Sequence, residues 1–548
     1  MTSKIIHILL LCCFFFGPMT VVSACSDKQN IESTNNALTS VALIPQPESL
    51  VYGSNNIVLP SVITLTNEIK GVPASLLVST LEQVCNEVQT VSNDNAFVRV
   101  LHNSNLGDDE YSINIGAENI QIEYSQPQGL LWGIQTLRQI ILQCSTDDMG
   151  NNTIPMLSLQ DKPKKNWRGF HVDVARHAFT MNYLKKIVDC LSFYKINKLQ
   201  LHLTDDQGWR IEIKKYPALT SVGGWRQFDE YDKRCIELSN DDPDYLIDSR
   251  FIRNGNEYGG YYTQEELKDF VKYALDRGID VIPEIDMPGH FSAAIKAFPN
   301  LSCTGGADWG KEFSFPVCAG KTENYAFMKN ILDEVLAIFP SEYIHIGADE
   351  VETDNWTVCP YCQKMIKDNN LMNTSGLLNY FVKDISDYLK SKGKKVMVWD
   401  DAFYKRKPLD LIYTYWRDWL PEQPGDITQS GHSMIFMEWG RFYLSGTPSD
   451  KALKSLYTFT YEPQFPGIIQ SKVTGFQACV WTEMIPNERK FGEHVFPSLQ
   501  AFAEVAWGST RDWDRFVRYL PWHLKWLNSN GIHCRKPDFL KKNPSDRT

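Results

Sequence analysis

The chain has 548 residues, which is too long for one ordinary domain and suits two or three. Hydrophobic residues make up 43% of the sequence and aromatic residues 12%, so a large core is available and the composition is not that of a disordered chain. The formal net charge of -11 argues against nucleic acid as the main partner.

The N-terminus has the pattern of an export signal. A basic start at Lys4 precedes an apolar run and then small residues. The end of this stretch, Val22-Ser23-Ala24-Cys25, resembles a bacterial lipobox, in which the chain is cut before the cysteine and the cysteine carries lipid. We expect a lipoprotein signal peptide over 1–24 and a polar tether over 25–42.

This pattern predicts an exported bacterial lipoprotein, in the periplasm or at the outer-membrane surface. Its only membrane contact would be the lipid anchor on Cys25. One alternative is a plain secretory signal that is cut near Ala24. A spanning helix is a weaker alternative, because the segment is short and Gly17-Pro18 interrupts it.

The sequence contains 13 cysteines, and an exported protein can oxidise those outside the signal. Cys303 and Cys318 lie in one loop-like region, where a disulfide is plausible. Cys359-Pro-Tyr-Cys362 is a lone CxxC motif. A zinc site would need a second pair at similar spacing, which the sequence lacks. We therefore expect a local disulfide or free thiols, with no metal and no cofactor.

A small α/β unit is predicted over 43–160. Short strand-like runs occur at 97–101 and 111–115, and residues 128–142 have the apolar spacing of a helix.

From about residue 165 the pattern changes to alternating strands and helices. One helix, 263–278, has Thr263 as N-cap and Gly278 just beyond its end, and another is expected over 322–339. The predicted strands are 169–175, 198–203, 279–285, 343–347, 394–400, 411–416, 433–439 and 475–481. Eight strand–helix units fit a TIM (β/α)8 barrel better than an open sheet. We place the barrel at 161–525 and a C-terminal tail at 526–548.

Polar residues follow most of these strands, where a TIM barrel has its active site. One acid alone would be interpreted as a helix cap or a loop ion pair. A set that converges on one rim suits a sugar, because indole rings cover apolar faces while acids and Arg bind hydroxyls. The set comprises Asp173, Arg176, His177, Asp205, Asp206, Glu284, Asp286, His290, Asp349, Glu350, Trp399, Asp400, Asp401, Trp416, Trp481 and Glu483.

Several long motifs resemble the family 20 glycoside hydrolases, the β-N-acetylhexosaminidases. They are "HVDVARH", "LHLTDDQGWR", "IPEIDMPGH", "HIGADE" and "CVWTEM", and the resemblance covers roughly 43–525. It implies a retaining exo-hydrolase that acts on glycans with a terminal β-linked N-acetylhexosamine. This family is an exception to the two-carboxylate scheme, because the substrate's own 2-acetamido oxygen attacks and forms an oxazolinium intermediate.

The resemblance also implies roles for the catalytic residues. Glu350 is the expected general acid and then general base, and Asp349 is expected to accept the acetamido N–H. Tyr443 would donate a hydrogen bond to the acetamide oxygen. Asp205 and His290 resemble a relay that touches Glu350, with Asp206 as the second choice for its acid.

Five further residues are expected to bind the sugar. Trp399, Trp416 and Trp481 would wall the acetamide pocket, and Arg176 and Glu483 would bind ring hydroxyls.

The chain departs from the family pattern at two positions. Ala348 stands where a second glycine is usual, and its methyl group crowds the turn into the acids. Ser445 stands where an aspartate commonly binds the O4/O6 side of the sugar, which leads to the hypothesis that a 6-sulfated sugar is tolerated or the gluco/galacto choice relaxed. The acidic insertion 229–257 is expected to form a long loop at the mouth, or simply a solvated loop.

Two other functions remain open. A non-catalytic sugar-binding lipoprotein would need to have lost the acid pair, which is present. A metal-dependent hydrolase would need a ligand cluster such as HExxH, which the sequence does not contain.

Overall fold

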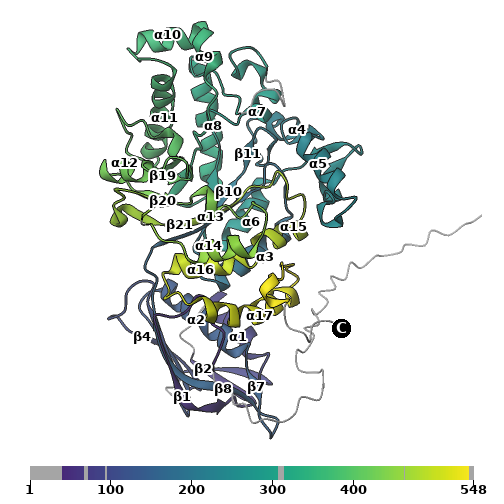
Figure 1. Cartoon of the computed structure of the whole chain (residues 1–548), viewed down its shortest axis with the longest axis vertical. Coiled ribbons are helices and arrows are strands. Elements are labelled where there is room, and N and C mark those ends of the chain that lie inside the picture. Colours follow the sequence, from purple (N-terminus) through teal and green to yellow (C-terminus); the bar gives the residue numbers. More distant parts are fainter. Residues whose placement is uncertain (1–39, 67–71, 93–94, 307–313, 462, 542–548) are drawn as a thin grey trace, which may run out of the picture. The chain divides into compact units, whose positions relative to one another are not determined.

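The computed structural model describes residues 40–541 except 67–71, 93–94, 307–313 and 462 (Figure 1). The predicted signal peptide and Cys25 lie outside the described residues. The end of the predicted tether is not a tether: Val41 and Ala42 are buried, and the Ala42 amide donates to Gln143 Oε1 at 2.7 Å. No helix of the described residues has both the length and the apolar composition that a bilayer span requires.

The N-terminal part is a mixed sheet with helices over one face (Figure 1). The strand order is β1-β8-β5-β6-β4-β2-β3, with β7 paired to β8. The elements are β1 (Ser49–Val58), β2 (Val62–Thr66), α1 (Val72–Leu81), β3 (Glu87–Val91), β4 (Val98–His102), β5 (Tyr111–Ile115), β6 (Ile120–Tyr124), α2 (Pro127–Ile141), β7 (Ser145–Thr146) and β8 (Asn152–Asp161). Alternating residues of these strands are buried, because one face packs against the helices.

A closed barrel of parallel strands follows, in the order β10-β16-β17-β18-β19-β20-β21-β9. The strands are β9 (Trp167–Asp173), β10 (Lys198–His202), β16 (Asp280–Glu284), β17 (Tyr343–His345), β18 (Lys395–Trp399), β19 (Ile412–Tyr415), β20 (Met434–Phe436) and β21 (Val473–Val480). The first strand pairs with the last, Gly169 opposite Gln477, which closes the ring. The predicted TIM barrel is confirmed.

The helices that follow the barrel strands are built from amphipathic stretches whose apolar side is buried against the ring. They are α3 (Met181–Phe193), α6 (Gln264–Leu275), α8 (Thr322–Ile338), α11 (Thr374–Ser391), α12 (Gln423–Gln429), α14 (Asp450–Tyr457), α15 (Glu488–Val495), α16 (Ser498–Trp507) and α17 (Trp513–Ser529). Thr263 caps α6 as predicted, in a reciprocal capping box with Glu266. Helix α17 runs to Ser529, past residue 526, where the sequence placed the start of a tail.

Short elements line the loops above the ring. They are β11 (Thr204–Asp205), β12 (Gly208–Trp209), α4 (Ala218–Ser221), α7 (Ser292–Ala297), α9 (Asp354–Val358), α10 (Pro360–Asp368) and α13 (Trp439–Phe442).

The acidic insertion is not a long loop, and in this the sequence prediction was wrong. Helix α5 (Glu230–Leu238) lies beside a small sheet of β13 (Trp225–Gln227), β15 (Glu257–Gly259) and β14 (Ile252–Arg253). Buried ion pairs hold it: Asp232 Oδ1 lies 2.8 Å from Arg226 Nη2 and 3.1 Å from His177 Nε2. Some of the acids that seemed to indicate a solvated loop instead form ion pairs with the buried Arg226.

A buried polar cluster joins the sheet domain to the barrel. Asp161, at the end of β8, accepts hydrogen bonds from Lys195 Nζ (2.8 Å), Tyr111 Oη (2.5 Å) and Trp507 Nε1 (2.8 Å). The Lys195 ammonium also lies over the Trp507 ring, 4.5 Å from its centroid.

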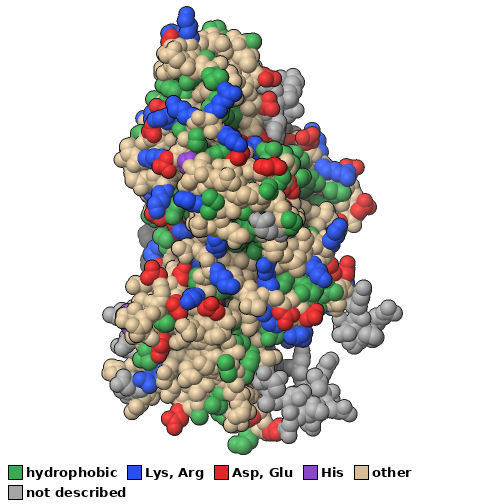
Figure 2. All heavy atoms as spheres, turned by 60° about the vertical axis from the view of Figure 1, so that its left-hand side comes forward, with side chains coloured by type: hydrophobic (Ala, Val, Ile, Leu, Met, Phe, Trp, Pro, Cys, Tyr) green, Lys and Arg blue, Asp and Glu red, His purple; other side chains and the backbone are tan. Residues whose placement is uncertain are grey.

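The molecular surface carries charges of both signs. On the face drawn in Figure 2, Lys and Arg side chains are interspersed with Asp and Glu side chains. Nucleic-acid-binding proteins instead gather basic residues into one patch or stripe.

Candidate active site

The turn after β17 carries the two adjacent acids. Gly347, Ala348 and Glu350 all have positive φ, of 66°, 68° and 47°. A Cβ on Gly347 would lie 1.8 Å from Asp286 Oδ1, so glycine is required there for space as well as for conformation. Left-handed residues on either side of Asp349 break the alternation of a strand, which explains how neighbouring side chains can face one site.

Both acids face His290. Its Nε2 lies 3.4 Å from Glu350 Oε2 and 3.8 Å from Asp349 Oδ2. Its Nδ1 lies 3.2 Å from both Asp205 Oδ1 and Asp206 Oδ2, so the two candidate acids of the relay both contact the ring. Burial alone would lower the pKa of His290, but Asp205 and the hydrogen bonds around the ring outweigh it and hold this pKa well above its ordinary value.

A buried chain of charges continues below His290. Asp205 Oδ2 accepts from His202 Nε2 at 2.7 Å, and His202 Nδ1 lies 3.0 Å from Glu284 Oε2. Glu284 Oε1 in turn accepts from Trp399 Nε1 at 2.8 Å. His202, and with it His171 and Gln200 that also bond to Glu284, was not predicted as part of the site. The available signal was the alternation of polar residues with leucine in "KLQLHL", a strand in which Gln200 and His202 are both buried.

Arg176, just after β9, is held by acids from two other strand ends. Its Nη2 lies 2.8 Å from Asp205 Oδ2 and its Nη1 3.9 Å from Glu483 Oε1. The guanidinium lies over the Trp481 ring, 4.9 Å from the centroid. The side chain of Glu483 is 30% exposed and therefore keeps free acceptor surface at the mouth.

The three predicted tryptophans and Tyr443 form one aromatic group. Trp399 and Trp481 have ring centroids 5.9 Å apart, and Trp416 stacks on Tyr443 at 6.3 Å with an interplanar angle of 15°. Asp401 Oδ2 fixes Trp416 by accepting from its Nε1 at 2.7 Å. Burial raises the pKa of the Tyr443 hydroxyl well above its ordinary value, which keeps this group a hydrogen-bond donor.

Asp349 has an unsatisfied oxygen. Its Oδ1 is buried and has no hydrogen-bond partner among the described residues. Burial and the like charge of Asp286 hold the pKa of Asp349 well above its ordinary value, and burial raises the pKa of Asp286 itself to about 7. A buried acceptor without a partner is costly, so this oxygen is a natural position for a donor from a ligand.

Two residues near the acids pack rather than face a ligand. His345 is fully buried, and its Nε2 lies 3.0 Å from Thr414 Oγ1. Trp356 is also fully buried and donates from Nε1 to the Val317 carbonyl at 3.0 Å.

The His and acid side chains of the site also meet in groups with the spacing of metal ligands. His202, Asp205 and Asp286 form one such group, and Asp205, Asp206 and His290 another. Most of their ligand atoms already pair with one another as ion pairs and hydrogen bonds, which explains their convergence without a metal.

The chain matches two family models over most of its length. The catalytic domain of glycosyl hydrolase family 20 matches residues 166–510, and domain 2 of the same family matches residues 40–162.

Similar curated proteins carry the name beta-hexosaminidase. One from Porphyromonas gingivalis is 32% identical over 457 residues, which cover 79% of this chain and 55% of that protein. The chain thus spans about half the length of this relative. Another from Vibrio furnissii is 29% identical over 518 residues, which cover 89% of this chain and 79% of that protein.

Solved structures of the family have the same fold. An exo beta-N-acetylglucosaminidase from Vibrio harveyi, solved in complex with N-acetylglucosamine, gives a TM-score of 0.77 at 27% identity, with 90% of this chain and 78% of that chain covered. A beta-N-acetylhexosaminidase from Bacteroides fragilis gives 0.75 at 28%, with 90% and 97% covered. The acid pair on its turn, the barrel and the matches to both domains lead to one conclusion: the chain belongs to glycoside hydrolase family 20.

Proposed function

We propose that the protein is an exo-acting, retaining β-N-acetylhexosaminidase. It would release terminal β-linked N-acetylglucosamine or N-acetylgalactosamine from a glycan by substrate-assisted catalysis. The observation that carries the proposal is the Asp349-Glu350 pair, in which both acids face His290 and the buried Oδ1 of Asp349 has no partner among the described residues.

In the first step Glu350 protonates the glycosidic oxygen while the C1–O bond breaks. The oxygen of the substrate's own acetamido group attacks C1 from the other face and closes an oxazolinium ring. Asp349 accepts the acetamido N–H and stabilises the positive charge that develops there. Water then adds to C1 as Glu350 takes its proton, the ring opens, and the sugar leaves with its original configuration.

The aromatic group would set the geometry of this step. A donor hydrogen bond from Tyr443 and the walls of Trp399, Trp416 and Trp481 hold the acetamide oxygen below C1. Arg176 and Glu483 would bind ring hydroxyls at the opposite side.

The remainder of the glycan has a candidate place beside the insertion. A cavity of about 220 Å³ is lined by Asp206, Gln207, Trp225, Arg226, Ser292 and Lys296, among others. Asp206 connects it to the site because it also contacts His290. The cavity would place the leaving group beside β13, the strand that pairs with β15 of the small sheet.

Replacing the acid tests the proposal. We expect Glu350→Gln to lower kcat/KM for a nitrophenyl N-acetylglucosaminide by about 10²–10⁴-fold. The loss should be smaller for leaving groups of low pKa, since they need less protonation. Glu352→Gln, two residues along and exposed, is the matched control and should keep wild-type activity.

Other outcomes would support the alternatives. Wild-type rates in Glu350→Gln would refute the assignment of the acid. Purified wild-type protein that binds N-acetylglucosamine but turns over no aryl glycoside would be a non-catalytic sugar-binding protein.

Ser445 bears on the substrate. A neutral side chain at this half-buried position would not repel an anionic 6-substituent. We expect measurable kcat/KM on a 6-sulfated aryl N-acetylglucosaminide, and a selective loss of that activity in Ser445→Asp. No turnover of the sulfated compound by the wild type would end the sulfate hypothesis.

The lipid anchor on Cys25 is also part of the proposal, and the lipobox alone supports it. Cells fed a tagged fatty acid should label the wild-type protein and fail to label Cys25→Ser. Equal labelling of both would contradict it, and release of unlabelled wild-type protein would favour a plain secretory signal.

A further inference from the structure

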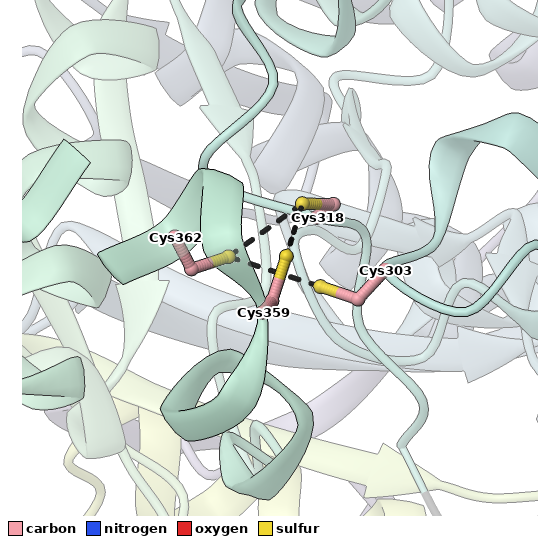
Figure 3. A group of neighbouring side chains, drawn as sticks. All are labelled: Cys303, Cys318, Cys359 and Cys362. Carbon is pink, nitrogen blue, oxygen red and sulfur yellow. Dashed lines mark hydrogen bonds between the residues drawn. The ribbon is translucent and has the colours of Figure 1, made fainter. Parts of the chain in front are cut away.

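Four cysteines meet outside the active site. Cys303 and Cys318 precede α8, while Cys359 and Cys362 flank the start of α10 (Figure 3). Their sulfur atoms all lie within 4.8 Å of one another. The sequence contains no second CxxC motif. The partners of Cys359 and Cys362 are instead Cys303 and Cys318, which are separated by 14 residues rather than two.

The spacing of the sulfurs is that of a tetrahedral metal site. The Sγ–Sγ distances are 3.7 Å for Cys303–Cys362, 3.6 Å for Cys318–Cys359 and 3.5 Å for Cys318–Cys362. Four thiolates at about 2.3 Å from one zinc ion lie about 3.8 Å apart. A disulfide would need about 2.05 Å, and none of the ten described cysteines forms one in this structure. Cys318 is nearly equidistant from two sulfurs, which fits a shared centre and favours neither as a disulfide partner.

The surroundings suit a negatively charged centre. Cys359 is the N-cap of α10 and Pro360 its first residue, so the positive end of the helix dipole faces the sulfurs. A Cβ on Gly320 would lie 2.2 Å from the amide nitrogen of Cys362, so glycine allows the two chain segments to approach this closely.

We propose that these four cysteines bind one zinc ion or a chemically similar thiophilic divalent cation. The four thiols lose their protons to solvent and the four thiolates bind the ion, so no oxidant or reductant is needed. All four positions of the tetrahedron are taken by protein, which makes the site structural.

The ion would brace the loops that hold the acid pair and His290. Trp356, just before the CxxC motif, donates from Nε1 to the carbonyl of Val317 at 3.0 Å. The Val317 amide in turn donates to the Pro288 carbonyl at 2.9 Å, two residues before His290.

Three residues before Val317, Ser314 contacts the candidate active site directly. Its Oγ accepts from the His290 amide at 3.1 Å, and its own amide donates to Asp206 Oδ2 at 3.0 Å. A metal at the cysteines would therefore hold, through Ser314, both the backbone of His290 and the carboxylate of its partner Asp206.

The metal content of the purified full chain tests the proposal. This measurement does not depend on turnover, so a failure of the metal proposal can be distinguished from a failure of the proposed function. We expect about one zinc per chain by elemental analysis and native mass spectrometry. Cys359→Ala and the less disruptive Cys303→Ser should lose it. Cys190→Ala, which removes a buried thiol far from the group in sequence, should keep it.

Three results would overturn the proposal. One is a metal-free wild type whose intact mass lacks one hydrogen per cysteine of the group, as two disulfides require. Another is full zinc content in both Cys359→Ala and Cys303→Ser. If those variants are insoluble, Co²⁺ added to chelator-treated wild type decides: the absorption of a tetrahedral cobalt thiolate is expected, and its absence refutes the site.

Discussion

Asp349 is the residue whose ionisation should be visible in kinetics. Its pKa lies well above the ordinary value because burial and the charge of Asp286 outweigh the attraction of His290. The free protein therefore keeps a proton on the Asp349–Asp286 pair at mildly acidic pH, and the pair titrates as a unit. In the proposed mechanism the acetamido N–H and the developing cation need the carboxylate of Asp349, so protonation of Asp349 would work against both.

We expect kcat/KM to fall as the pH is lowered through the pKa of this pair. Bound substrate stabilises the ionised form of Asp349. The acid limb of the kcat profile should therefore lie at lower pH than the acid limb of the kcat/KM profile. Profiles between about pH 4 and pH 9 measure both limbs. Asp349→Asn should lower kcat by about 10²–10³-fold and remove the acid limb. An unchanged acid limb in that variant would show that another group controls it.

At the scale of elements, the turn after β17 tests whether its shape positions the acids. Gly347→Ala would place a methyl group 1.8 Å from Asp286 Oδ1. We expect a loss of kcat/KM of about 10²-fold, since a shift near 1 Å in catalytic groups costs that much.

Gly393→Ala is the matched control for this turn. Gly393 has φ of 79° but no atom within 4 Å of its Cβ position. Both variants carry the left-handed cost of about 1 kcal/mol, so only the clash differs. Equal activity in the two would show that the space beside Asp286 is unimportant.

The sequence predicted the barrel and its strands because period and caps are local signals. Strand β10 and helix α8 lie within a residue of their predicted ranges, and Thr263 caps its helix. The sequence prediction failed where contacts join segments that are distant along the chain. The partner of the CxxC motif lies in another loop, and the acids of the insertion pair with Arg226 inside the fold. Spacing along the chain carries no information on either.

The convergence of the candidate site residues was predictable for the same reason that the barrel was. Strand ends of a barrel meet at one rim, so the order of motifs alone brings Arg176, His290 and Glu350 together. What the sequence could not show is the layer beneath, in which His202 connects Asp205 to Glu284, because residues that point into a barrel are not distinguished by position.

For the whole molecule, the buried pair of Lys195 and Asp161 should couple the sheet domain to the barrel. We expect Lys195→Met to lower the free energy of unfolding by about 3–5 kcal/mol, because it leaves a buried carboxylate without its cation. Urea unfolding followed by tryptophan fluorescence and by circular dichroism measures the change. Lys186→Met, at an exposed position of α3, should be close to neutral. Equal midpoints for the two variants would show that the junction contributes little.

The seam between β9 and β21 has a consequence for synthesis. Across it, the His177 amide donates to Thr482 Oγ1 over a separation of 305 residues, and Arg176 covers Trp481. A chain that enters its folding compartment from the N-terminus therefore presents Arg176 and His177 long before Trp481 and Thr482 arrive. Until the last strand arrives, the first has an open edge that can pair with other chains. Aggregation during that interval is therefore a second limit on the yield of active protein, besides the stability of the finished barrel.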